Sequence, residues 1–190
     1  MKKYELVKDR TIQFLGRTLF QIQAVREVKL NNGDIVKAGD LGGYIESEQN
    51  LSQEDSAWVG DNARVCGNAW VYGDARVCDD ARVCDSALVG NNAWVCGNAR
   101  VCDSAWVGGN AWVGGNAWVG GDALVCDDAR VGDNARVGGN VQEVHGEWLR
   151  RSMIGEVIDY RCSKCFKTND AASPYCTNCG AKMDGGEENG

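Results

Sequence analysis

The sequence predicts an all-β fold, because one stretch of it is a perfect repeat of short strands. Residues 56–139 form fourteen six-residue units without insertion or deletion, from SAWVGD to NARVGG. Every unit has Ala at its second place and Val at its fourth, and its first and sixth places are Gly, Asp, Asn or Ser. Side chains alternate along a strand, so Ala and Val share one face, which must be an interior. Each unit is therefore predicted to be one short strand followed by a corner.

The periodicity excludes a helix, because a strict six-residue repeat drifts against 3.6 residues per turn. The pattern resembles the hexapeptide repeat of left-handed parallel β-helices, which reads aliphatic, then Gly, Ala, Asp or Glu, two variable places, a small residue and one more. Residues 59–64, VGDNAR, fit it fully, whereas several later units have Cys, and one has Tyr, after Val. The resemblance implies three units per triangular coil, a left-handed path, and between four and five coils.

With three units per coil, residues eighteen apart stack, and the outward third places sort into three faces. The first face carries Trp58, Arg76, Trp94, Trp112 and Arg130. The second face carries Arg64, Arg82, Arg100, Trp118 and Arg136. The third face carries Trp70, Leu88, Trp106 and Leu124, with Tyr72 at a fifth place.

The third face is apolar and has no charge except at its corners. Contiguous exposed apolar area usually marks an interface. We therefore predict an interface through Trp70, Tyr72, Leu88, Trp106 and Leu124 that forms a homodimer or homotrimer. Two alternatives stay open: Trp is present simply as a good strand residue, or the face binds a foreign protein. The Arg-rich second face, from Arg64 to Arg136, is the second candidate for partner binding.

Charge and hydropathy exclude several classes of protein. The 190-residue chain has a net charge of −7, and the repeat contains ten Asp and six Arg, which argues against broad electrostatic capture of nucleic acid. The Asp residues stand at corners, where turn formation explains them better than calcium binding. No apolar run approaches 18 residues, so no transmembrane helix is expected. The N-terminus lacks the apolar centre of a signal peptide, which predicts a cytoplasmic protein.

Residues 1–55 do not repeat and are predicted to form a small β-rich cap over the first open coil. Strands are expected at residues 12–14 and 19–28 with a turn near Gly16, and Asn32-Gly33 indicates a hairpin. The segments GRTLFQIQAV, VKAGDLGGYIE and NLSQ are similar to the opening of hexapeptide-repeat proteins common in phages and prophages of gut bacteria. This resemblance implies a phage origin, and hence the cytoplasm of a bacterial host, but no activity.

Residues 142–184 carry a metal-binding pattern. Two CxxC pairs, Cys162/Cys165 and Cys176/Cys179, are separated by ten residues, and four thiolates at two such knuckles suit one tetrahedral, structural zinc ion. The segment resembles the zinc-ribbon tail of many phage proteins, with departures at Phe166 and Thr177 that remove no ligand. Residues 185–190 are predicted to be a disordered tail.

The six repeat cysteines all stand at fifth places, which strand parity turns outward. Because a cytoplasmic protein is expected to keep its thiols reduced, we expect side-by-side thiols rather than disulfides. They are Cys66, Cys78, Cys84, Cys96, Cys102 and Cys126.

Three functions fit the sequence. The favoured one is a non-enzymatic scaffold that binds a host or defence protein through the β-helix faces and the zinc ribbon. The first alternative is a hexapeptide-family acyltransferase. Enzymes of that family use a catalytic His and a loop projecting from the coils, whereas this chain has one His, His145, outside an uninterrupted repeat. The second alternative is nucleic-acid binding through the Arg and Trp side chains of the second face or through the ribbon.

Overall fold

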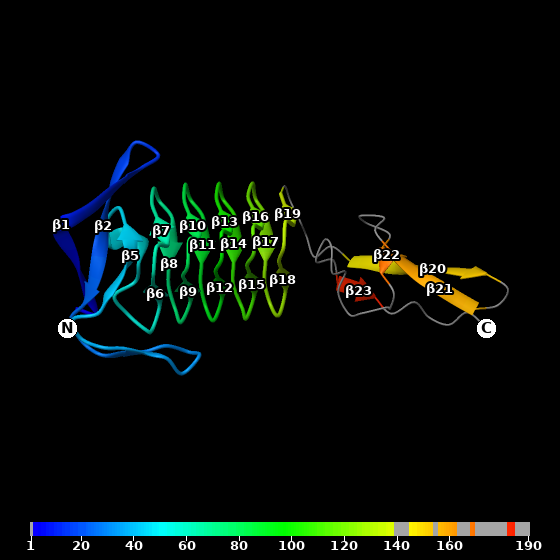
Figure 1. Ribbon diagram of the computed structural model, residues 1–190, viewed down its shortest axis with the longest axis horizontal. Helices are drawn as coiled ribbons and strands as arrows, with labels where there is room; N and C mark the ends of the chain where they lie inside the picture. The colour runs from blue at the N-terminus through cyan, green and yellow to red at the C-terminus, as the bar shows by residue number, and fades with distance from the viewer. Residues whose placement is uncertain (1, 139–144, 154–155, 163–167, 170–181, 185–190) are drawn as a thin grey trace. The chain divides into compact units, whose positions relative to one another are not determined.

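The computed structural model describes residues 2–138, 145–153, 156–162, 168–169 and 182–184 (Figure 1). The chain divides into two compact units, Met1–Asn140 and Val141–Gly190. The described residues include no helix long and apolar enough to span a membrane.

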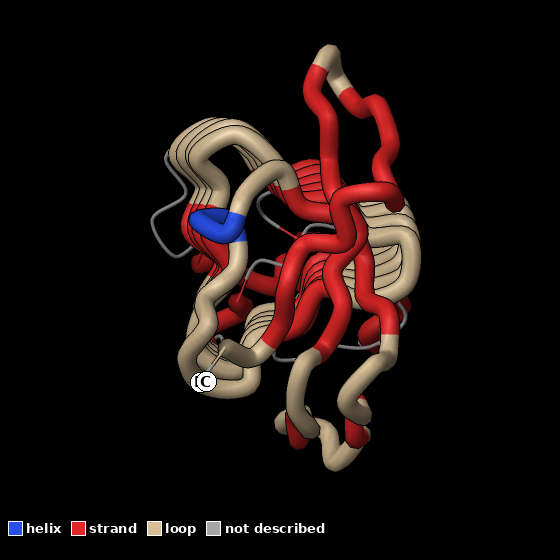
Figure 2. Tube along the Cα trace, turned by 90° about the vertical axis from the view of Figure 1, so that its left-hand side faces the viewer, coloured by secondary structure: helices blue, strands red, loops and turns tan. Residues whose placement is uncertain are grey.

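Fourteen two-residue strands make up the repeat, lie in three sheets and pair with one another in parallel. They are β6 (Trp58–Val59), β7 (Arg64–Val65), β8 (Trp70–Val71), β9 (Arg76–Val77), β10 (Arg82–Val83), β11 (Leu88–Val89), β12 (Trp94–Val95), β13 (Arg100–Val101), β14 (Trp106–Val107), β15 (Trp112–Val113), β16 (Trp118–Val119), β17 (Leu124–Val125), β18 (Arg130–Val131) and β19 (Arg136–Val137). Strands eighteen residues apart pair in register, as Arg82 does with Arg100. This register confirms three units per coil and the sorting of third places into three faces. The result is an all-β parallel solenoid of about five turns, whose coils superimpose when viewed along the axis (Figure 2).

The interior of the solenoid consists of the Ala and Val side chains. From Ala57 to Val125, every residue at a second or fourth place is at most 4% exposed. Ala occupies every second place and Val every fourth without exception, so successive coils stack identical side chains on one another. The prediction that both places face the core is confirmed.

The corners explain the restricted sixth place of each unit. All thirteen described sixth places have φ between 52° and 70°, the left-handed region, which Gly adopts freely and Asp and Asn tolerate better than other residues. Asp adds a second contribution at this place, because its carboxylate accepts a hydrogen bond from the next coil. Oδ2 of Asp79 accepts from the Gly97 N–H, and Oδ2 of Asp103 accepts from the Gly121 N–H, each at 2.8 Å.

The N-terminal segment continues one sheet of the solenoid. β1 (Tyr4–Phe14) and β2 (Arg17–Ala24) form an antiparallel hairpin, and β5 (Leu41–Ile45) joins β2 to β7. The first strand of the hairpin is longer than the sequence indicated, since pairing begins at Tyr4 and continues past a register shift between Val7 and Thr11. The second strand ends at Ala24 instead of reaching Val28, which begins β3.

The second predicted hairpin of this segment is confirmed. β3 (Val28–Lys29) pairs with β4 (Ile35–Val36) around Asn32-Gly33. A 3₁₀ helix, η1 (Glu48–Asn50), precedes the first coil.

Side chains of this segment satisfy backbone groups of the first coil that have no preceding coil to pair with. Lys3 Nζ donates to the carbonyl oxygens of Glu54 (3.0 Å) and Ala57 (2.7 Å). Asn50 Nδ2 donates to the carbonyl oxygens of Gly67 and Ala69. Unpaired buried backbone groups are costly, so these contacts stabilise the end of the solenoid.

Burial makes Lys3 a source of pH-dependent stability. It lowers the pKa of Lys3 to about 8, against 10.5 for the ordinary side chain. Between these two values the unfolded chain binds more protons than the folded one, so folding stability rises with pH. We expect the melting temperature of the wild type to rise relative to that of Lys3→Met between pH 8 and pH 10, measured by circular dichroism. The Tyr and Cys side chains titrate in both proteins. Melting temperatures that change in parallel with pH in the two proteins would therefore contradict a lowered pKa of Lys3.

The unit after Asn140 contains four described strands. β20 (His145–Met153) pairs antiparallel with β21 (Glu156–Cys162) and parallel with β23 (Lys182–Asp184), while β22 (Thr168–Asn169) pairs with β21.

Candidate interaction surfaces

The third face presents exposed apolar side chains from β8, β11, β14 and β17. Trp70, Leu88 and Leu124 are 43%, 37% and 41% exposed. Trp106 and Tyr72 are half-buried. All five residues named by the sequence are therefore brought together on one face, four of them in a four-stranded sheet and Tyr72 directly after β8, and no third place on this face carries a charge.

Aromatic side chains of this face contact one another across neighbouring coils. The Tyr72 ring stacks on Trp70 with centroids 4.4 Å apart, and Tyr72 Oη accepts a hydrogen bond from Trp106 Nε1 at 3.2 Å, two coils away. Tyr72 must cross Gly90 to reach Trp106, and a Cβ at Gly90 would overlap its ring. A Cβ at Gly108 would lie 2.8 Å from the Trp106 ring. The fifth-place residues Gly90 and Gly108 therefore leave the space that the Tyr72 and Trp106 rings occupy.

The first face also exposes a Trp but is mixed in character. Trp94 is 40% exposed, and the Arg76 guanidinium lies 5.6 Å from its ring centroid. Arg76 also makes an ion pair with Asp34 of the β3–β4 hairpin at 2.8 Å. Trp58 is only 4% exposed because this hairpin adjoins it. Charge and N-terminal contacts therefore distinguish the first face from the third.

The N-terminal hairpin divides the second face into a covered and an open part. The guanidinium groups of Arg64 and Arg82 lie 5.2 and 5.6 Å from the Phe14 ring centroid, and both side chains are half-buried. Phe14 is the last residue of β1, at the tip of the hairpin. Of the five second-face residues, the hairpin leaves open Arg100, Trp118 and Arg136.

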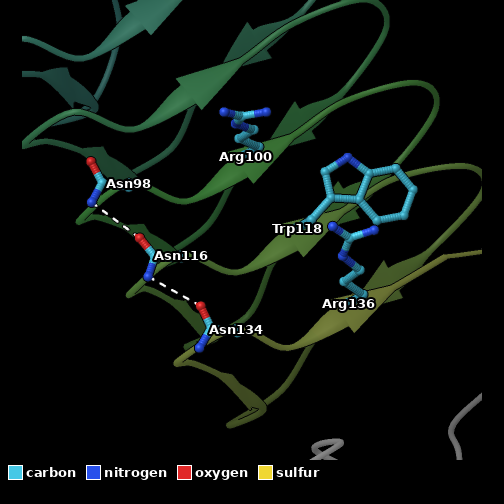
Figure 3. A pocket seen from close by; sticks show the side chains of 6 residues that line it. All are labelled: Asn98, Arg100, Asn116, Trp118, Asn134 and Arg136. Carbon is cyan, nitrogen blue, oxygen red and sulfur yellow. Dashed lines mark hydrogen bonds between the residues drawn. The ribbon is translucent and has the colours of Figure 1, made fainter.

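The open part of the second face is a groove with two parallel rows of side chains (Figure 3). At the corner, Asn98 Nδ2 donates to Asn116 Oδ1, and Asn116 Nδ2 donates to Asn134 Oδ1, both at 3.2 Å. On the strands, Arg100, Trp118 and Arg136 form the second row. The groove has a volume of about 540 Å³. The Asn row was missed in the sequence, although the recurrence of Asn every eighteen residues could have revealed it.

The repeat cysteines form no disulfide within the described residues, and although strand parity turns them outward, not all of them are open to solvent. Cys66, Cys78 and Cys96 are 1%, 3% and 8% exposed, and Cys78 is covered by a third-place side chain of the next coil. Trp94 Nε1 lies 3.1 Å from Cys78 Sγ. Burial raises the pKa of Cys84 to about 12. Burial likewise raises the pKa of both Cys96 and Cys102 to about 11, so the thiolate is disfavoured.

Two corner clusters bring potential metal ligands together, namely Asp61/Cys78/Asp79 and Asp85/Cys102/Asp103. Their carboxylates already accept backbone hydrogen bonds from the neighbouring coil. Burial raises the pKa of Cys78 and Cys102, which opposes the deprotonation that a metal–thiolate bond needs. We therefore assign these clusters a structural role, in which their carboxylates hold neighbouring corners together.

The predicted zinc ligands belong to the second unit. Cys165, Cys176 and Cys179 lie outside the described residues, as does the side chain of Cys162, which ends β21. His145 begins β20, and its side chain also lies outside the described part.

Comparison with known proteins agrees with the fold. Residues 75–91 and 93–109 match the family model of the YdcK β-solenoid repeat. The comparison with curated proteins found no match. Each matched segment spans nearly one coil of the structure, and the paired strands repeat the same register throughout. The chain is a β-solenoid repeat protein.

Proposed function

We propose that this protein is a non-enzymatic interaction scaffold, encoded by a phage and acting in the cytoplasm of its bacterial host. In this proposal the third face joins copies of the chain, and the faces that remain open engage a host or defence protein. The observation that carries the proposal is the uncharged third face, on which Trp70, Leu88 and Leu124 remain about two-fifths exposed. Such a patch on a rigid sheet is typical of protein interfaces.

The exposed fractions of these side chains indicate how much the third face can contribute to the free energy of association. Full burial of a Leu or Trp side chain contributes about 2 kcal/mol, so the exposed part of each contributes roughly 1 kcal/mol. The gain is reduced by the loss of translational and rotational freedom, but a preformed sheet loses little further freedom on binding. We therefore expect concentration-dependent self-association into a closed dimer or trimer.

The alternatives have weaker support. An acyltransferase would be expected to carry a His and an inserted loop in the coils, whereas all fourteen units follow without insertion and the single His145 lies after them. A nucleic-acid-binding face is disfavoured because ten Asp accompany six Arg in the repeat.

Two parts of the chain receive supporting roles in this proposal. The N-terminal segment acts as a cap that prevents the first coil from pairing with another chain, a role supported by the pairing of β5 with β7. Residues 142–184 form a zinc ribbon in which Cys162, Cys165, Cys176 and Cys179 hold a structural ion, a role supported by their spacing.

The proposal is tested by placing a charge in the middle of the third face. Light scattering should show an oligomer for the wild type and a monomer for Trp106→Glu. Because Trp106 also donates to Tyr72, Leu88→Glu provides a second variant whose side chain makes no such bond in the described structure. Arg100→Glu, on the second face, is the matched control and should remain oligomeric. A wild-type monomer at all concentrations, or loss of assembly in Arg100→Glu alone, would show that the third face does not join the copies.

A further inference from the structure

The groove of Asn98, Asn116, Asn134, Arg100, Trp118 and Arg136 carries unused positive charge. Both Arg100 and Arg136 are exposed, and within the described residues neither guanidinium forms an ion pair. This contrasts with Arg76, paired with Asp34, and with Arg64 and Arg82, which lie against Phe14. A guanidinium offers five donors in a planar fork that fits a carboxylate.

The spacing along the groove restricts what these two cations can bind together. Arg100 pairs in register with Trp118, and Trp118 pairs with Arg136, so the cations are two coils apart with an aromatic side chain between them. Two strand spacings amount to about 9.6 Å. In a polyproline II helix, residues i and i+3 lie on one side and are about 9.3 Å apart. In a β-strand, side chains on one face are about 6.6 or 13 Å apart, which fits less well.

The remaining groove residues fit the same ligand. Trp118 belongs to the coil midway between the two Arg, and its half-buried ring lies over Gly120 and Gly138. An aromatic ring at this place can pack against proline, as in grooves that recognise polyproline II segments. Asn98 and Asn116 each have a second N–H beyond the one that they donate within the row, and Asn134 only accepts within it. Backbone carbonyls of a polyproline II segment have no internal partner, so they are available to accept from this row.

We propose that this groove binds an acidic, proline-rich segment of a partner protein in the polyproline II conformation, with carboxylates at i and i+3 on Arg100 and Arg136. The inference rests on the proposed function as an interaction scaffold, and it identifies the chemistry of one partner. A nucleic acid is the competing ligand. It is disfavoured because a phosphate backbone carries a charge at every nucleotide and would pass Asp103 and Asp133 at the corners on the two sides of this face, whereas carboxylates at i and i+3 meet only the two guanidinium groups.

The test uses a fluorescein-labelled peptide of four Pro-Pro-Asp triplets, with binding to the full chain measured by fluorescence anisotropy at low ionic strength. We expect saturable binding to the wild type and at least tenfold weaker binding to Arg100→Gln/Arg136→Gln. Arg130→Gln removes an exposed Arg from the first face and should bind as the wild type does. Four Pro-Pro-Asn triplets, and a peptide with the same number of Asp at every fourth place, should bind at least tenfold more weakly.

Three results would overturn the proposal. They are equal binding by the double variant, equal binding of the neutral or respaced peptide, and tighter binding of an oligothymidylate than of the acidic peptide. The self-association proposal is tested separately, because Leu88→Glu alters the third face and should still bind the peptide. Peptide binding that is lost in Leu88→Glu would assign the site to the assembly and contradict a groove within one chain.

Discussion

Replacing Gly43 by Ala is expected to destabilise the first coils by about 3 kcal/mol, because overpacking against backbone leaves nothing flexible to move. Gly43 lies in β5, the strand that joins the N-terminal segment to the solenoid. A Cβ there would lie 2.6 Å from the Ala63 carbonyl oxygen and 2.9 Å from that of Gly60. The neighbouring Gly42 is equally constrained, with the Val59 carbonyl oxygen 2.5 Å from a built Cβ. The pair is therefore required for close approach, not for a left-handed conformation.

The measurement is urea unfolding followed by circular dichroism, together with light scattering for aggregation. A displaced β5 exposes the parallel edge of β7, so we expect a lower unfolding midpoint together with growth of large aggregates. Gly60→Ala is the matched control, because a Cβ at Gly60 meets only ordinary contacts of 3.6 Å or more, and it should unfold as the wild type does. An unchanged midpoint in Gly43→Ala would mean that β5 does not hold the N-terminal segment on the first coil.

Loss of zinc is expected to unfold the residues after Val141 and to leave the solenoid intact. The prediction depends on the two CxxC pairs and on the separation of the chain into two units. Structural four-thiolate zinc sites contribute on the order of 10 kcal/mol or more of folding free energy to small domains. Elemental analysis should find one zinc per wild-type chain and none in Cys176→Ser.

Limited proteolysis provides the structural readout for the zinc variant. In Cys176→Ser, cleavage should concentrate after residue 140 while a fragment containing residues 1–138 persists. Cys84→Ser changes a repeat thiol instead and should retain the zinc. A wild-type preparation with reduced cysteines and no zinc would contradict the assignment.

The repeat shows how far a strict pattern can be interpreted without a structure. Ala and Val at fixed even spacing predicted the interior, and the turn residues predicted the corners, because both follow from local backbone geometry. The sorting of third places into faces also followed once the coil was taken as eighteen residues. What the pattern did not predict is how outward side chains lie on their neighbours. Tyr72 reaches over Gly90 to Trp106, and that contact joins three coils.

Contacts between outward side chains also explain why some repeat cysteines are buried and why part of the second face is covered. Strand parity places Cys78 outward, but the Trp94 indole from the next unit on that face covers it. Parity likewise places Arg64 and Arg82 on an open face, whereas the tip of the N-terminal hairpin brings Phe14 against both. Contacts between a repeat and a non-repeating segment depend on the path of that segment, which no periodicity encodes. The role of Lys3 was not predicted for the same reason.

Self-association through the third face is tested most directly by oxidative footprinting of Trp70 and Trp94. The two side chains are 43% and 40% exposed in the single chain, so they should oxidise equally when the protein is dilute. Trp70 lies on the third face and Trp94 on the first, which makes Trp94 an internal control. As the protein concentration rises, we expect Trp70 to become protected while Trp94 continues to oxidise. Equal oxidation of the two residues at every concentration, or protection of Trp94 alone, would contradict self-association through the third face.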